Sequence, residues 1–271
     1  MSMHNLQDKI VIVTGGLGQI GRSLVGGFLA EGARVAVLNR KLPPAADQAT
    51  LFPDHGDRVT FFEADVTRKD PLLAALAGIE TRWGVPDVLI NNAGIDSKPY
   101  DPVEASGPFE TYPVELWEKV LSVNLTGVML CSQVFGAAMA RARKGSIINI
   151  GSIYGLVSPQ PAVYAYREER DGRPFHKAIS YSTSKSGLLN FTRHLAVYWA
   201  KSGVRVNLLT YGGIYNETYD EQFKKNFTDR VPMGRQAHLE ECVGPALFLA
   251  SSSSSYMTGA NLVVDGGWTA W

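Results

Sequence analysis

Cysteine is scarce in the sequence, because only Cys131 and Cys242 occur among 271 residues. The two form no close pair and no spacing that is typical of a metal site, which argues against a disulfide framework and a cysteine-based metal centre. Each lies in an apolar helical pattern, where a buried free thiol is the usual interpretation. We therefore expect a protein of a reducing compartment that binds no metal.

An excess of charge is also missing, since Lys plus Arg and Asp plus Glu number 26 each. Without a net field, neither nucleic acid nor an acidic membrane is expected as the main partner. The N-terminal stretch MSMHNLQDK has no basic region, and the apolar run Ile10 to Val13 is too short for an export signal or a membrane span. A soluble, cytoplasmic protein is expected.

Short β-branched runs alternate with helix-sized segments along the whole chain. This alternation predicts an α/β protein of the Rossmann type, with a doubly wound, seven-stranded parallel sheet covered by helices on both faces. No linker divides the chain, so residues 1–271 are expected to form a single domain with its site at the carboxyl ends of the strands. The runs are KIVIVT (9–14), RVAVL (34–38), VTFFEA (59–64), DVLINN (87–92), SIINIG (146–151), VRVNLL (204–209) and NLVVD (261–265).

A glycine-rich turn, TGGLGQIG, covers residues 14–21 and opens a helix near Gln19. Glycine permits positive φ angles and close approach of a phosphate, while a helix N-terminus supplies N–H donors and partial positive charge. Because the turn directly follows the first run, it predicts dinucleotide binding by a single dinucleotide-binding and catalytic domain. The residues expected to contact the dinucleotide here are Thr14, Gly15, Gly18, Gln19, Ile20 and Gly21.

The pentapeptide YSTSK places Tyr181 and Lys185 one turn apart on the same face of a helix. Tyr181 alone among the eleven tyrosines has Lys at the fourth following position. A neighbouring ammonium favours the phenolate, so we expect Lys185 to make Tyr181 acidic. Ser152, at the end of the fifth run, is expected to hold a substrate oxygen between its hydroxyl and the phenol. An interfacial aromatic and a helix-capping serine are the structural alternative.

Further motifs follow the remaining runs in order, and together they resemble the short-chain dehydrogenase/reductase family from Lys9 to the end of the chain. The short length and the ending Asp265-Gly266-Gly267 match the single-domain branch of that family. The other motifs are Asp65-Val66 after the third run, Asn91-Asn92-Ala93-Gly94 after the fourth, Asn124 in SVNLTG, and Ser152 after the fifth.

The resemblance implies an NAD(P)-dependent oxidoreductase whose catalytic residues are Asn124, Ser152, Tyr181 and Lys185. Asn124 lies in the middle of a long helical pattern, where Asn lowers helix propensity. By the resemblance it kinks that helix and holds a water that links Lys185 to solvent, whereas a solvent-facing Asn is the alternative. The resemblance also implies that Asp65 accepts a hydrogen bond from adenine, unless it is a simple loop residue. Further cofactor contacts are implied for Val66, Asn92, Ala93, Gly94, Gly212 and Ile214.

The end of the second run, Leu38-Asn39-Arg40-Lys41, bears on the choice of nicotinamide cofactor. An acid at this point binds the ribose diol and repels a 2′-phosphate, and no acid is present. Arg40 could hold the phosphate in a bidentate pair, which favours NADP. NAD stays open, because Asn39 can bind a diol and the two cations could be solvated loop charges.

Three segments are expected to form insertions on the substrate side, near residues 96–113, 158–178 and 214–235. Between Ser152 and Tyr181 lie 28 residues, well over the length usual in the family. The aromatic and charged side chains of this stretch could bind a polar, even anionic, substrate, could contact another subunit, or could be a solvated excursion. The family's Pro-Gly after the sixth run is replaced by Tyr211-Gly212-Gly213, and the segment 214–235 resembles the family's mobile lid.

The long insertion and the aromatic tail resemble family members that act on sugars, sugar acids or polyols. We therefore expect a small polyhydroxylated substrate that is interconverted between a secondary alcohol and a ketone. The resemblance also implies a homotetramer, formed through the helices that carry Asn124 and Tyr181, and Trp268 and Trp271 would suit a contact between subunits.

Two rival functions remain open. The spacing of Gly15, Gly18 and Gly21 resembles the epimerase-like branch of the family, so a nucleotide-sugar epimerase or dehydratase with resident NAD is one alternative. The other is a non-catalytic regulator that binds a nicotinamide, although the presence of all four catalytic residues counts against it.

Overall fold

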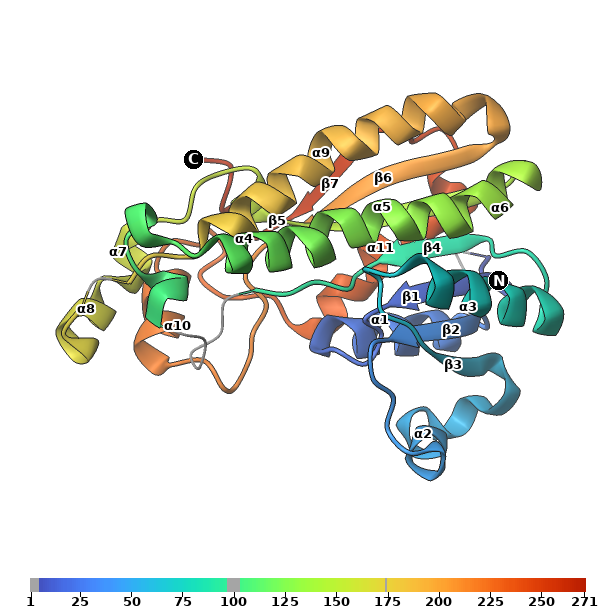
Figure 1. Cartoon of the computed structure of the whole chain (residues 1–271), viewed down its shortest axis with the longest axis horizontal. Coiled ribbons are helices and arrows are strands. Elements are labelled where there is room, and N and C mark those ends of the chain that lie inside the picture. The colour runs from blue at the N-terminus through green and yellow to red at the C-terminus, as the bar shows by residue number, and fades with distance from the viewer. Residues whose placement is uncertain (1–4, 97–102, 174) are drawn as a thin grey trace.

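The computed structural model describes residues 5–96, 103–173 and 175–271, and its centre is a seven-stranded parallel sheet (Figure 1). The strand order β3-β2-β1-β4-β5-β6-β7 reverses direction once, between β1 and β4, which confirms the expected doubly wound Rossmann fold. Each strand begins and ends within two residues of an expected run. The strands are β1 (Ile10–Thr14), β2 (Arg34–Asn39), β3 (Val59–Glu63), β4 (Val88–Asn91), β5 (Gly145–Ser152), β6 (Val204–Tyr211) and β7 (Asn261–Val264).

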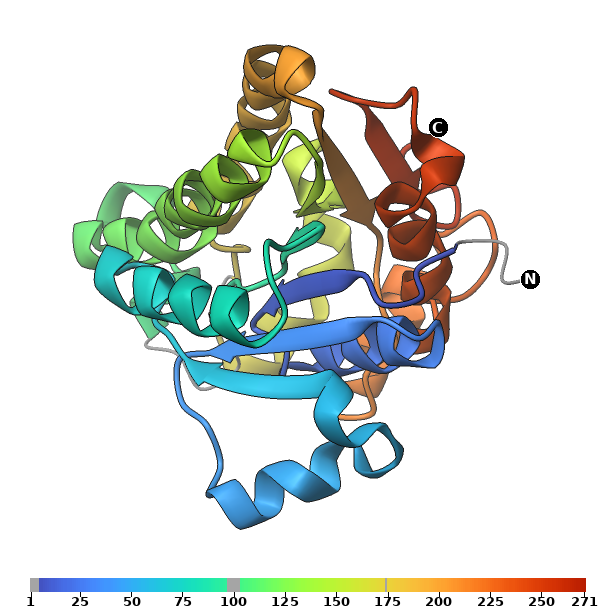
Figure 2. The same cartoon turned by 90° about the vertical axis from the view of Figure 1, so that its right-hand side faces the viewer.

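Helices cover both faces of the sheet (Figure 2). Because successive strand residues point to opposite faces, Val11 and Val13 belong to one buried layer, and Ile10 and Ile12 to the other. The first layer is closed by α1 (Gln19–Ala30) and α11 (Val243–Ala250), and the second by α3 (Lys69–Arg82), α9 (Ile179–Trp199) and the long helix before β5. Cys131 and Cys242 are buried free thiols, one in each layer, as expected.

The long helix spans Val114–Arg141 and contains two π-helical turns. It comprises α4 (Val114–Leu121), α5 (Gly127–Cys131) and α6 (Ala137–Arg141), separated by the π turns Ser122–Thr126 and Ser132–Gly136. In length and composition this helix would suffice to cross a membrane. Because 44% of its most apolar window is buried inside the fold, where it covers the sheet beside α9, we interpret it as a core helix.

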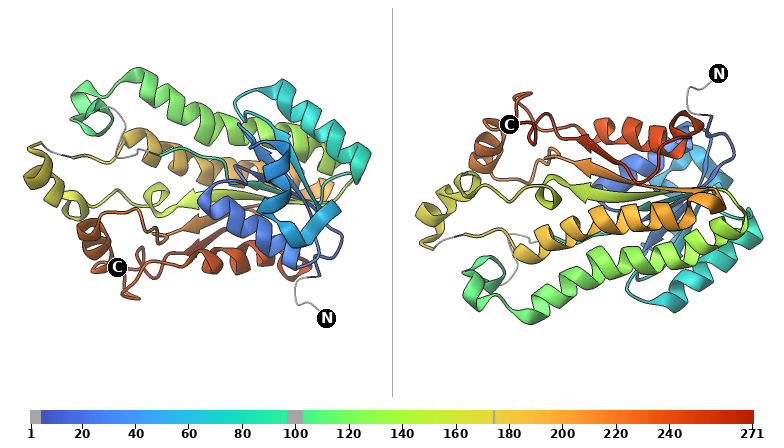
Figure 3. Two further views of the ribbon diagram at one scale, coloured as in Figure 1. Left: turned by 90° about the horizontal axis from the view of Figure 1, so that it is seen from below. Right: turned by 90° about the horizontal axis from the view of Figure 1, so that it is seen from above.

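Segments far apart in the sequence meet beyond the carboxyl ends of the strands. The insertion forms α7 (Pro161–Tyr164) and α8 (Tyr166–Asp171), and the lid-like segment forms α10 (Glu221–Thr228). Figures 1 and 3 show these helices together with the C-terminal tail at one end of the molecule, away from α2 (Ala45–Leu51). Part of the segment 96–113, residues 97–102, lies outside the described residues.

Candidate active site

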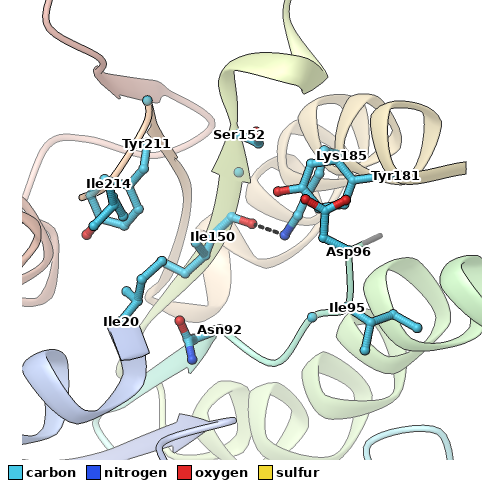
Figure 4. A pocket seen from close by; sticks show the side chains of 13 residues that line it. Ile20, Asn92, Ile95, Asp96, Ile150, Ser152, Tyr181, Lys185, Tyr211 and Ile214 are labelled. Carbon is cyan, nitrogen blue, oxygen red and sulfur yellow. Dashed lines mark hydrogen bonds between the residues drawn. The ribbon is translucent and has the colours of Figure 1, made fainter. Parts of the chain in front are cut away.

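A cavity of about 190 Å³ lies at the carboxyl ends of β4, β5 and β6 (Figure 4). Its walls come from the start of α1, the loops after β4 and β6, the end of β5, and the first turns of α9. This is the edge of the sheet at which the sequence predicts the site. The lining residues are Ile20, Asn92, Gly94, Ile95, Asp96, Ile150, Gly151, Ser152, Tyr181, Lys185, Tyr211, Gly212 and Ile214.

The glycine turn is shaped to admit a dinucleotide. Gly15 has a φ of +62°, and a Cβ atom there would lie 2.8 Å from the Ala93 Cα, while a Cβ at Gly21 would lie 2.3 Å from the Gly15 carbonyl oxygen. Gly18 caps α1 without a side-chain hydrogen bond, so the first N–H groups of the helix have no side-chain cap. A close backbone and unsatisfied donors fit the pyrophosphate of a dinucleotide.

The side chain of Gln19 forms its hydrogen bonds outside the glycine turn. Its Nε2 donates to the Tyr215 carbonyl oxygen at 2.8 Å, and its Oε1 accepts from Asn216 Nδ2 at 2.9 Å. The side chain therefore ties the start of α1 to the loop after β6. Ile20, the next residue, faces the cavity together with Ile214, as Figure 4 shows.

Thr14 and Asn92 join the end of β1 to the loop after β4. Thr14 Oγ1 accepts from the backbone N–H groups of Asn92 and Ala93 at 3.1 and 3.0 Å. Asn92 Nδ2 donates to the carbonyl oxygens of Thr14 and Gly15, both at 3.0 Å. These polar groups hold the two strand ends at a fixed separation, so the NAG motif supports the sheet as well as lining the cavity through Asn92 and Gly94.

The residues expected at the adenine end lie beside the glycine turn, outside the lining of the cavity. Asp65 Oδ1 accepts from the Thr67 N–H and hydroxyl at 2.9 and 2.7 Å. Although burial raises the pKa of Asp65, these bonds and the charge of Arg40 hold it below its ordinary value, so the group is an acceptor. The Asn39 side chain makes a local hydrogen bond, because its Nδ2 donates to the Lys41 carbonyl oxygen at 2.9 Å. Val66 is buried beside the long helix.

Ser152, Tyr181 and Lys185 come together on one wall of the cavity (Figure 4). Ser152 ends β5 and lines the cavity with Tyr181, and its Oγ accepts a hydrogen bond from the Tyr154 N–H at 3.2 Å. Lys185 Nζ donates to the Ile150 carbonyl oxygen at 2.8 Å and lies 5.9 Å from the centre of the Tyr181 ring. Glycine at position 155 lets the turn after β5 pack against α9, since a Cβ atom there would lie 2.7 Å from the Lys185 carbonyl carbon.

The acidity expected of Tyr181 is wrong. Burial and the charge of Asp96 raise the pKa of Tyr181 above its ordinary value, and the nearby Ser152 hydroxyl opposes them only in part. Lys185 does not reverse this, because its ammonium is bound to a backbone carbonyl oxygen and burial lowers its own pKa to about 8. Spacing alone placed the two groups correctly, but burial in a low-dielectric site penalises both charged forms.

Asn124 is completely buried in the first π turn of the long helix, which excludes the solvent-facing alternative. Its Oδ1 accepts from the Ile95 N–H at 2.8 Å, and its Nδ2 donates to the Ile95 carbonyl oxygen at 2.9 Å and to Ser184 Oγ at 3.1 Å. The side chain thus fixes the loop after β4 against α9, next to Lys185. A wide π turn stands where a kink was expected, and the water beside Asn124 stays a prediction.

The turn Tyr211-Gly212-Gly213 replaces a rigid proline by an anchored aromatic. Tyr211 Oη donates to the Cys242 carbonyl oxygen at 2.6 Å, which fixes the end of β6 to the start of α11. A Cβ atom at Gly213 would lie 2.3 Å from the Phe227 ring, so glycine lets the lid-like segment pack directly on the turn. The chain then continues to Ile214, which lines the cavity as expected.

The insertion packs onto the substrate side through aromatic contacts. The hydroxyl groups of Tyr164 and Tyr154 are 3.0 Å apart, and the Tyr164 ring lies 5.1 Å from Phe175 and 5.7 Å from Phe223 of α10. Trp268 stacks on Phe227 at 4.4 Å and is buried. A solvated excursion is therefore wrong for the insertion, and the expected use of Trp268 between subunits is wrong because this ring is buried within its own chain.

Several lining residues were not identified from the sequence. Ile150 and Gly151 belong to the fifth run, whose glycine carried no separate signal, and Tyr211 stood in a position usually taken by proline. Asp96 follows the NAG motif by two residues and begins the segment 96–113 that was expected on the substrate side, but no pattern marked this residue individually. Its significance depends on a partner 81 positions away, Lys177.

Comparisons with known proteins agree with this geometry. A family model described as enoyl-(acyl carrier protein) reductase matches residues 17–269. Galactitol 2-dehydrogenase (L-tagatose-forming) of Cereibacter sphaeroides is 34% identical over 276 residues, covering 100% of this chain and 98% of that protein. A short-chain dehydrogenase of Leptospira borgpetersenii with bound NAD+ has a TM-score of 0.83 at 34% identity, covering 98% of this chain and 94% of that one.

A gluconate 5-dehydrogenase from Burkholderia cenocepacia, in complex with NADP and tartrate, has a TM-score of 0.84 at 28% identity and covers 100% of both chains. The extent of these matches and the fold show that the chain belongs to the short-chain dehydrogenase/reductase family. It is an NAD(P)-dependent oxidoreductase that acts on CH–OH groups.

Proposed function

We propose that Ser152, Tyr181, Lys185 and Asn124 catalyse the interconversion of a secondary alcohol and a ketone on a sugar or polyol. The observation that carries this proposal is that Ser152, Tyr181 and Lys185 line the same cavity, with the Lys185 Nζ 5.9 Å from the centre of the Tyr181 ring. Similarity to a galactitol dehydrogenase supports the substrate class. The described cavity residues include polar groups on several walls, which suits a substrate with several hydroxyl groups.

The chain's own side chains handle the proton. Tyr181 takes the hydroxyl proton of the alcohol during oxidation and returns it during reduction, while the Ser152 hydroxyl holds the same oxygen. Lys185 stays within reach because the Ile150 carbonyl oxygen fixes its Nζ. When bound, oxidised nicotinamide accepts the carbinol hydride and contributes positive charge that favours the phenolate. Asn124 acts as a positioning residue, because it fixes the loop that carries Ile95 and Asp96.

The experiment that tests this function measures absorbance of reduced nicotinamide with sugars, polyols and sugar acids, supplying NAD and NADP in turn. We expect substrate-dependent formation of reduced cofactor with at least one polyhydroxylated secondary alcohol. An epimerase or dehydratase with resident NAD would instead carry nucleotide through purification and turn over without added cofactor. Absence of any hydride transfer with a broad set of alcohols and ketones would refute the proposal.

We further propose that NADP is the preferred cofactor, held at its 2′-phosphate by Arg40. Arg40 is exposed next to Asp65 at the end of β2, and β2 ends in Asn39 without an acid. Replacing Arg40 by Ala should raise the KM for NADP by about tenfold or more, the worth of a charge-assisted hydrogen bond, and leave the KM for NAD within about twofold. Steady-state kinetics with both cofactors check this, and Arg58→Ala, just before β3 at the opposite edge of the sheet, is the control. Equal effects on the two cofactors would contradict it.

The assembly we propose is a homotetramer built on α9 and the long helix. In support, α9 exposes Val197 and Tyr198 near its C-terminal end, with 81% and 70% of each residue open to solvent in the single chain. Neighbouring exposed apolar side chains on one helix suit a contact between subunits. Sedimentation equilibrium measures the mass directly, and a monomer at micromolar concentration would contradict the proposal.

A further inference from the structure

Asp96 presents a carboxylate to the cavity beside the proposed catalytic residues. It follows the loop fixed by Asn124, and Figure 4 shows it next to Tyr181 and Lys185. Lys177, from the end of the insertion, donates to Asp96 Oδ2 at 2.5 Å, and the Lys177 Nζ lies 5.3 Å from the centre of the Tyr181 ring. The loop after β4 and the insertion therefore meet at one ion pair.

The two members of this pair are not equally accessible. The Asp96 side chain is 38% exposed and lines the cavity, whereas the Lys177 side chain is 12% exposed and does not belong to the lining. A substrate that enters the cavity thus meets the carboxylate first. To reach the ammonium of Lys177, an anionic group would have to displace Asp96 from a charge-assisted hydrogen bond.

Two other cations of the insertion are held away from the cavity. Arg167 stacks on Phe175 at 4.1 Å and pairs with Asp171 at 3.2 Å. Arg170 pairs with Asp171 and with Asp220 at the start of α10, both at 2.7 Å. These pairs close the insertion onto the lid-like segment and engage Arg167 and Arg170 with carboxylates of their own chain.

The charge of Asp96 affects the pKa of several groups in the site. It contributes, after burial, to raising the pKa of Tyr181 and of Tyr219, and it opposes the lowering of the Lys185 pKa. A second negative charge placed in the same cavity would be repelled by Asp96, because interactions between charges are weakly screened in a site of low dielectric.

We propose that Asp96, held by Lys177, is a specificity-determining residue that accepts hydrogen bonds from substrate hydroxyl groups and selects uncharged polyols and sugars over sugar acids. The inference rests on the proposed oxidoreductase function and narrows its substrate class. A carboxylate accepts hydrogen bonds from two neighbouring hydroxyl groups, whereas it repels a substrate carboxylate.

The test compares a set of hexitols with the hexonates of matching configuration, as kcat/KM with the preferred cofactor. We expect the wild-type enzyme to prefer the hexitol by about tenfold or more, since like charges that meet in one cavity are disfavoured. Asp96→Asn keeps the size of the side chain and removes its charge, so it should raise kcat/KM for the hexonate and reduce the preference by about tenfold. Asp171→Asn, which breaks an ion pair of the insertion outside the cavity lining, should leave the ratio unchanged.

The variant Lys177→Met distinguishes a role of Asp96 in substrate recognition from a role of the ion pair in folding. It leaves the carboxylate in the cavity without its ammonium, so the preference for the hexitol should persist or increase even where overall activity falls. A wild-type preference for hexonates, an unchanged ratio in Asp96→Asn, or a Lys177→Met variant that selectively loses hexonate turnover would overturn the inference. Absence of turnover with every alcohol tested would instead refute the proposed oxidoreductase function.

Discussion

Tyr181→Phe should lower kcat by about 10²- to 10⁴-fold, the range that a positioned general acid–base supplies. The substitution removes one oxygen atom and leaves a ring of nearly the same volume, packed beside the aromatic cluster of the insertion. Ser152 would keep its hydrogen bond from the Tyr154 N–H. The dissociation constant of the nicotinamide cofactor should stay within about threefold, because the glycine turn and Asp65 lie elsewhere.

Stopped-flow hydride transfer and cofactor titration by fluorescence measure the two quantities separately. Tyr112→Phe is the matched control, since Tyr112 Oη lies 2.7 Å from Ser180 Oγ at the start of the same helix, α9, yet outside the cavity lining. It should retain turnover within about threefold, because a neutral hydrogen bond contributes about 1 kcal/mol. Undiminished hydride transfer in Tyr181→Phe would exclude Tyr181 as the acid–base.

The arrangement of the sheet was predictable because burial on both faces imposes continuous β-branched runs on central strands. The same logic located the site, since the motifs that follow each run must gather at the carboxyl edge. Asn124 could be noticed for a related reason, as a polar residue in an otherwise apolar helical pattern. Its bonds to Ile95 show why an amide is needed there: one side chain satisfies both a donor and an acceptor of an irregular loop.

Properties that depend on burial or on distant partners were not predictable. The sequence spacing brings Lys185 near Tyr181, but it carries no information about the dielectric around the two groups. The predicted lowering of the Tyr181 pKa was therefore wrong, because burial raises it. Trp268 looked like a surface anchor because its neighbour in space, Phe227, lies on another segment. Asp96 carried no signal for the same reason, since its partner belongs to the insertion.

Lys185→Met should abolish most turnover, by about 10²-fold or more, and should change stability in a manner that depends on pH. Burial lowers the pKa of Lys185 from 10.5 to about 8. A difference of this size corresponds to about 3 kcal/mol of destabilisation when the buried ammonium is protonated. Removing the ammonium relieves this penalty, but the Ile150 carbonyl oxygen then loses its donor, which costs about 1–3 kcal/mol.

The pH dependence separates these two contributions. Below pH 8 both folded and unfolded chains carry the ammonium, so the penalty in the wild type is fully present. Between pH 8 and 10.5 the folded chain releases a proton that the unfolded chain still binds, and the stability contributed by this site therefore rises with pH. The lost hydrogen bond to Ile150 has no such dependence.

Urea unfolding of wild type and Lys185→Met at pH 7 and pH 10 measures the difference between the two free energies of unfolding. The free energy of unfolding of Lys185→Met minus that of the wild type should fall by about 2–3 kcal/mol from pH 7 to pH 10, because the buried ammonium of the wild type loses its proton. Lys144→Met is the control, since Lys144 is half exposed in an ion pair with Asp87, and its difference should change by less than about 1 kcal/mol. A constant difference for Lys185→Met would mean that the amine keeps its ordinary pKa in the folded protein. The site would then keep its ammonium between pH 8 and 10.5 as well, and over that range its charge would favour the Tyr181 phenolate.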